Sequence, residues 1–140
     1  MAHSGSGHRA VPHTADLRIE AWAPTRNGCI RQAVLGTVES FLDLSSAQAD
    51  HQSRRRLIAD RDDDLLVAVL DEVIYRLDTA AEAPVDLELR DVDGGVEATF
   101  EMTDAGRAAQ VGAVPKAVSL NDLRFSRGRH GWRCLVTLDV

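Results

Sequence analysis

Two aspartates near opposite ends of the chain could share a metal ion. Asp16 opens residues 16–22, where apolar and polar side chains alternate as they do in a half-buried strand. Asp139 closes a second alternating segment, residues 132–139, one position before Val140. If the two strands pair, Asp16, Asp139 and the terminal carboxylate of Val140 would offer the hard oxygen ligands that calcium and magnesium prefer. Acids at strand ends are more often only hydrated, so spacing alone leaves both interpretations open.

Two further residues could take part in chemistry at such a site. His13 lies three residues before Asp16 and could form an acid–base pair with it. Lys116 opens an apolar segment, and its ammonium group could contact an acidic partner or a phosphate, although a hydrated lysine is the simpler interpretation. The sequence has no nucleophile elbow, glycine-rich phosphate loop, CxxC or HExxH motif. We therefore expect that this chain is not an enzyme.

Charge and cysteine content narrow the function classes. The formal net charge of −6 argues against a surface that binds nucleic acid directly. Cys29 and Cys134 lie far apart in the sequence, each in an apolar setting, so we predict two reduced, buried thiols. No segment approaches the roughly 18 apolar residues of a membrane span, and the N-terminal residues lack the apolar core of a secretion signal. The expectation is a cytoplasmic protein without membrane contact.

Helical spacing of apolar residues predicts two helices. Glycine, serine and histidine dominate residues 1–10, which we expect to be a disordered tail, and one domain should occupy residues 11–140. The first helix is expected over residues 26–43, with Thr25 as its N-cap. The second should begin at Asp60, in a run of acids that favours the positive end of a helix dipole, and end before Pro84.

The remaining segments predict strands. Residues 52–60 contain three consecutive arginines, which favour an exposed edge strand, although they could also bind phosphate or a partner's acids. Residues 85–92 and 96–103 flank Asp93-Gly94-Gly95, a hairpin signal. Residues 117–126 predict a strand with a bulge near Asn121. The fold class is therefore α+β, with the two helices packed on one side of a mainly antiparallel β-sheet in a single two-layer domain.

Four segments, taken in chain order, resemble the archease family. Together they cover nearly all of residues 11–140. They are His13-Thr14-Ala15-Asp16 with a strand ending in Ala21-Trp22, the second helix with Leu65-Leu66, Leu70-Asp71-Glu72 and Tyr75, then Lys116-Ala117-Val118-Ser119, and last Leu138-Asp139-Val140.

The resemblance implies an accessory protein for an RtcB-type RNA ligase, which joins RNA ends in tRNA splicing and RNA repair with GTP and a divalent metal. A member of this family is not itself the ligase. It promotes guanylylation of the ligase histidine and multiple turnover, and it meets RNA only indirectly. The family's opening and closing aspartates bind a metal ion, commonly assigned as calcium, and they correspond to Asp16 and Asp139, with Val140 beside them. Magnesium or manganese would also suit these ligands. The family lysine falls on Lys116, which we assign with His13 to the partner-binding surface.

The sequence also departs from the family pattern. Arg26 to Arg31 stand where the first helix usually begins with several glutamates, and Asn121 stands where a histidine is common. The metal ligands are kept, while the surface that meets the ligase is expected to differ. Two other functions stay open: an interaction module without metal dependence, and a small metal-dependent hydrolase.

Overall fold

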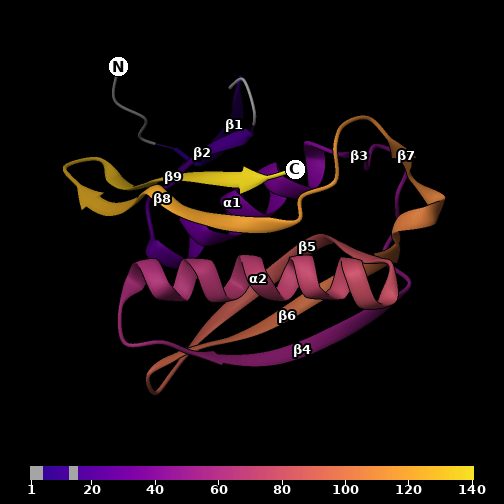
Figure 1. Ribbon diagram of the computed structural model, residues 1–140. Helices are drawn as coiled ribbons and strands as arrows, with labels where there is room; N and C mark the ends of the chain where they lie inside the picture. Colours follow the sequence, from indigo (N-terminus) through magenta and orange to yellow (C-terminus); the bar gives the residue numbers. More distant parts are fainter. Residues whose placement is uncertain (1–4, 13–15) are drawn as a thin grey trace.

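A computed structural model describes residues 5–12 and 16–140 of the chain (Figure 1). The described residues form two α-helices, one short 3-10 helix and a series of strands. In chain order the elements are β1 (Gly7–Pro12), β2 (Leu17–Ala23), α1 (Arg26–Glu39), β3 (Leu42–Asp43), β4 (His51–Ile58), α2 (Asp62–Ala80), β5 (Glu82–Val92), β6 (Gly95–Asp104), η1 (Ala105–Arg107), β7 (Ala109–Gln110), β8 (Ala117–Gly128) and β9 (Gly131–Asp139).

The strands form two larger sheets and one small one, and every pairing described is antiparallel. The four-stranded sheet has the order β1-β2-β9-β8, the three-stranded sheet has the order β4-β6-β5, and β3 pairs with β7. In Figure 1 the four-stranded sheet lies in the upper part of the view and the three-stranded sheet in the lower part. The predicted α+β class, with two helices and mainly antiparallel strands, is confirmed.

The layering differs from the predicted arrangement of two helices on one side of a single sheet. Helix α1 contacts both β2 and β5, and α2 contacts both β8 and β5, so each helix touches both large sheets. The composition of α1 explains this. It carries small or apolar residues around most of its circumference, and a helix of that kind has to be covered on two sides. Its buried residues are Cys29, Ile30, Ala33, Val34, Gly36, Thr37 and Val38.

The ends of α1 follow from local chemistry. The hydroxyl of Thr25 accepts a hydrogen bond from the backbone N–H of Gly28 at 3.0 Å, which confirms the predicted N-cap. The prediction extended this helix to residue 43, but it ends at Glu39 because the chain then enters β3. Gly36 allows close contact with the four-stranded sheet, since a Cβ there would lie 3.0 Å from Cγ2 of Ile19.

Helix α2 begins with three acids in its first turn and ends at Ala80, before Pro84 as predicted, with the left-handed Ala81 as its C-cap. One charged residue of this helix is buried. Glu72 is 9% exposed and accepts a hydrogen bond from Nε of Arg76 at 2.7 Å, while Nε of Arg55 lies 3.7 Å from it. The two arginines explain how a carboxylate can be buried at this position.

Three strand predictions are confirmed and one is corrected. β4 is an edge strand, β5 and β6 form the predicted hairpin, and the register between β8 and β9 shifts between Ser119 and Arg124, where the bulge was expected. The correction concerns the N-terminal segment. Residues 7–10 belong to β1, which pairs along β2, so the tail predicted for residues 1–10 does not extend over them. Among the described residues, no helix combines the length and apolar character needed to cross a membrane.

Candidate metal and partner-binding site

The first predicted strand and the last lie side by side. β2 pairs with β9, and the final pair of that ladder is Leu17 with Leu138. Asp16 and Asp139 are the next residues outward on the two strands, so their backbones meet at the same end of the sheet. Opposite residues of an antiparallel pair have Cβ atoms about 4.5–5.5 Å apart, which is short enough for two carboxylates to reach one ion. That these two aspartates bind a metal stays a prediction.

The exposure of this end of the sheet suits a binding site. Asp16 is partly buried, with its Oδ1 atom out of contact with solvent, whereas Asp139 is exposed. The side chain of Val140 is 38% exposed, so the last residue also lies at the surface. Asp139 and Val140 therefore both lie at the surface, where a solvated ion or a partner can approach.

The start of β8 brings Lys116 to the other side of Asp139. The backbone N–H of Lys116 donates a hydrogen bond to the carbonyl of Asp139 at 2.7 Å, and Ala117 pairs with Asp139. Lys116 itself is exposed. Three distant segments of the chain thus meet around the end of β9. His13, the remaining predicted residue, lies outside the described residues.

The available donor atoms limit the kind of ion that could be held. Within residues 5–12 and 16–140, no group of three or more histidine, cysteine, aspartate or glutamate side chains could hold a metal. As far as the described residues go, an ion at Asp16 and Asp139 would complete its shell with backbone oxygens and water. Calcium and magnesium accept such shells, whereas structural zinc sites usually require four nitrogen or sulfur ligands. The residues present thus fit a hard cation.

A second polar row crosses the same face of the sheet, two residues further along each strand. Arg18 lies opposite Thr137, and Thr137 lies opposite Ser119. Nη2 of Arg18 forms an ion pair with Asp122, a residue of the β8 bulge, at 3.3 Å. Thr137 is only 4% exposed, and its Oγ1 has no hydrogen-bond partner within the described part of the chain. A buried hydroxyl without a partner among the described residues therefore lies two positions from Asp139 on the same face.

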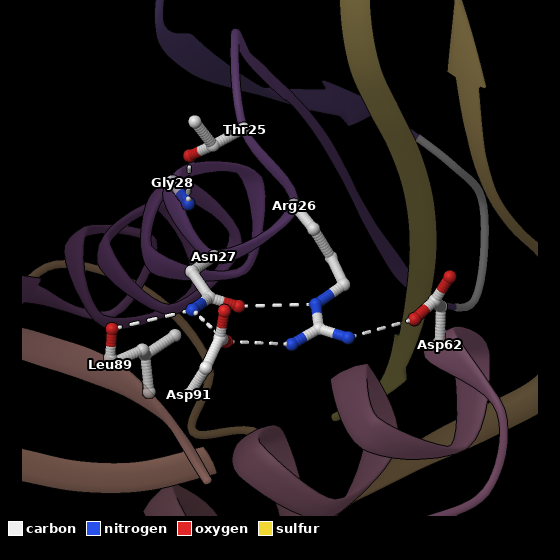
Figure 2. Close-up of polar contacts among 7 residues, drawn as sticks. All are labelled: Thr25, Arg26, Asn27, Gly28, Asp62, Leu89 and Asp91. Carbon is white, nitrogen blue, oxygen red and sulfur yellow. Dashed lines mark hydrogen bonds and ion pairs between the residues drawn. The ribbon is translucent and has the colours of Figure 1, made fainter. Parts of the chain in front are cut away.

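The non-acidic start of α1 lies far from this site. α1 follows the end of β2 at Ala23, and a seven-residue strand is roughly 20 Å long. Figure 2 shows what Arg26 does there: its guanidinium contacts Asp62 at 3.1 Å and Asp91 at 3.0 Å. Asn27 donates to Asp91 at 2.8 Å. Arg26 and Asn27 therefore tie α1 to α2 and β5.

The two cysteines are closer than their separation in sequence suggests. Both are buried free thiols, as predicted. The Cys29 thiol donates to the Ala21 carbonyl at 3.5 Å, and Ala21 is paired with Cys134. The Cys29 side chain and burial raise the pKa of Cys134, which keeps that thiol protonated and unreactive.

Sequence reasoning missed a groove that adjoins the site. It lies between the outward side of α2 and the segment that leads to Lys116, and its lining includes Asp71, Tyr75 and Val114. The i, i+4 spacing of Asp71 and Tyr75 on a predicted helix was a signal that one face of α2 carries both. The opposite wall could not be read from the sequence because residues 104–115 have no clear periodicity.

Comparisons with known proteins agree with this fold and its motifs. The model of the archease protein family (MTH1598/TM1083) matches residues 8–140. A probable protein archease of Mycobacterium tuberculosis is 80% identical over 137 residues, which are 98% of this chain and 76% of that protein. The protein archease of Archaeoglobus fulgidus is 25% identical over 135 residues, covering 95% of this chain and 98% of that protein.

Two solved structures share the fold. The solution structure of protein 1598 from Methanobacterium thermoautotrophicum has a TM-score of 0.76 at 20% identity, covering 96% of this chain and 99% of that one. The crystal structure of a Thermotoga maritima archease, described as a possible chaperone, has a TM-score of 0.68 at 16% identity, covering 93% of this chain and 94% of that one. The matched family and the close relative lead to one conclusion: this chain belongs to the archease family.

Proposed function

We propose that this chain is a metal-binding accessory protein that activates an RtcB-type RNA ligase by promoting its guanylylation and repeated turnover. The observation that carries the proposal is the meeting of Asp16, Lys116 and Asp139 around the end of β9. Membership of the archease family supports the same assignment. The role is one of assistance: the ligase performs the chemistry, and this chain meets RNA only through it.

The carboxylates of Asp16 and Asp139, together with oxygen atoms of Val140, would hold the divalent ion. Calcium fits best because it accepts many oxygen ligands in an irregular shell, and magnesium or manganese could replace it. Two carboxylates at neighbouring strand ends repel each other, so a cation at this point is favoured. When bound, the ion supplies positive charge that can attract phosphate or carboxylate oxygens of the partner.

The protein's own residues would set the geometry of that contact. The ladder between β2 and β9 fixes the two aspartates relative to each other, and the bond from Lys116 to Asp139 fixes the start of β8 beside them. The exposed ammonium group of Lys116 would contact a phosphate or an acidic side chain of the ligase. We also assign His13 to this partner-binding surface.

A turnover assay tests the proposal. An RtcB-type ligase is mixed with RNA ends, GTP and its metal, with and without this chain, and ligated RNA per ligase molecule is measured. The wild-type chain should raise the yield well above one turnover, and Asp16→Ala should remove this stimulation while circular dichroism shows an unchanged fold. Asp93→Ala, in the exposed β5–β6 turn, is the matched control and should stimulate fully. Full stimulation by Asp16→Ala would reject metal-dependent activation and leave a metal-independent interaction module.

A further inference from the structure

One face of α2 forms a wall of the groove that leads to the aspartate site. Asp71, Ile74, Tyr75 and Asp78 have the spacing i, i+3, i+4, i+7, so they share one face of the helix. The facing wall is the segment from Val114 to Lys116, and the groove encloses about 590 Å³. α2 therefore presents to the groove a stripe in which two apolar side chains lie between two acids.

The apolar part of this groove is unusually accessible. The Tyr75 side chain is 61% exposed, and Val114 is 39% exposed. Ile74 and Leu77, also in the groove, are only partly buried and reach the core from the same helix. Exposed apolar groups gathered in a concave surface are typical of interaction sites, and aromatic residues often provide most of the binding energy there.

The charged part of the groove defines what could fill it. Although Asp71 has solvent access, burial raises the pKa of its carboxyl group. Asp78 adds a second acid one helical turn beyond Tyr75. A ligand with a positive charge would relieve Asp71, whereas the phosphates of RNA would be repelled. The complementary ligand is therefore a peptide segment in which an apolar side chain stands next to an arginine or lysine.

The position of the groove connects it to the proposed metal site. Lys116 lines the groove and donates its backbone N–H to the carbonyl of Asp139. A protein segment lying along α2 would therefore bring its neighbouring residues to the carboxylates at the end of β9. Lys116 directly precedes Ala117, which pairs with Asp139, so one partner could contact both the groove and this end of β9.

We propose that this groove docks the partner protein, and that its occupant is a segment of the ligase that carries an apolar side chain beside an arginine or lysine. The inference rests on the proposed function for the identity of the partner. The apolar side chain packs between Tyr75 and Val114, and the basic group pairs with Asp71. The groove supplies affinity, while the aspartates at the end of β9 supply activation.

Separate measurements of binding and of activation test whether the groove provides affinity and the aspartates provide activation. The full chain and its variants are titrated against the ligase by calorimetry, and stimulation of ligation is measured over the same concentrations. Tyr75→Ala and Asp71→Asn should each weaken binding about tenfold or more, the size expected for a residue central to an interface. Stimulation at saturating concentration and calcium binding should stay unchanged. The controls are Ile58→Ala, which removes another exposed apolar side chain, and Asp93→Asn, which removes another exposed acid.

The outcomes separate the two proposals. If Asp16→Ala abolishes stimulation while Tyr75→Ala and Asp71→Asn bind the ligase as tightly as wild type, the groove proposal is overturned and the proposed function stands. If the wild-type chain neither binds nor stimulates the ligase, both proposals are overturned. If Tyr75→Ala instead changes the sedimentation of the chain alone, the groove is a contact between two copies, and the assignment to a ligase segment is wrong.

Discussion

Replacing Arg26 by alanine should destabilise the protein without affecting its site. Arg26 forms ion pairs with Asp62 and Asp91, whose side chains are 45% and 75% exposed (Figure 2). Exposed pairs of this kind contribute about 0.2–1 kcal/mol each. The Arg26 side chain is only 28% exposed, so its aliphatic part also loses packing. Together these losses predict that the free energy of unfolding falls by about 1–2 kcal/mol.

Urea unfolding followed by circular dichroism measures this change. With a denaturant slope of about 2 kcal/mol/M, the midpoint for Arg26→Ala should fall by about 0.5–1 M. Arg129→Ala is the matched control, because Arg129 is exposed in the β8–β9 turn and forms no ion pair within the described residues. Its midpoint should shift by less than about 0.25 M, the size of an ordinary surface substitution.

Two results would refute the reasoning about Arg26. If Arg26→Ala and Arg129→Ala had the same midpoint, the contacts in Figure 2 would not contribute to stability. If Arg26→Ala had the urea midpoint of the wild type but no longer stimulated the ligase, the start of α1 would belong to the partner-binding surface, despite its distance from Asp16. If Arg26→Ala does lower the free energy of unfolding, a double-mutant cycle with Asp91→Ala would show how much of that loss comes from the ion pair between Arg26 and Asp91.

Two further predictions concern stability. The hydrogen bond to Asp50, and then that to Glu82, raise the pKa of His51 above its ordinary value of 6.5. The stability that protonated His51 contributes is therefore fully present below pH 6.5, and it is lost as the pH rises through the higher pKa of the folded state. The melting temperature of the wild type should fall over that interval, whereas that of His51→Gln should not. Equal pH profiles of the two proteins would contradict this. Thr137→Val removes a buried hydroxyl that has no hydrogen-bond partner in the described residues. The free energy of unfolding, measured by urea titration, should therefore rise by about 1 kcal/mol. A less stable variant would show that the hydroxyl does have a partner.

Local patterns in the sequence predicted most of the elements. Alternation identified β2 and β9, and the similar placement of Asp16 and Asp139 led to the expectation that these strands are neighbours, which the pairing of Leu17 with Leu138 confirms. The hairpin of β5 and β6 followed from Asp93-Gly94-Gly95, and Gly94 indeed has a positive φ of 77°. These features depend on residues that are close in the sequence or that share one clear period.

The features that escaped prediction depend on tertiary contacts. β1 is short, and its strand structure comes from pairing with β2 rather than from its own composition. The two-sheet layering depends on α1 being covered on both sides, which a search for one apolar stripe does not reveal. The burial of Glu72 depends on Arg76 and Arg55, and Arg55 comes from a different element, so no pattern within the helix could show it. The groove required α2 and Val114 to be placed together, which no local pattern could do.

A crystal structure of the protein grown with calcium would show whether Asp16 and Asp139 bind a metal ion. We predict one ion at the end of β9, with carboxylate oxygens of both Asp16 and Asp139 at about 2.3–2.6 Å from it. Replacement of either residue by asparagine should remove or weaken the electron density of that ion. An ion bound elsewhere would contradict the proposed metal site. So would two carboxylates more than roughly 8 Å apart with no ion or water between them, since ligand bonds of about 2.4 Å cannot span that gap.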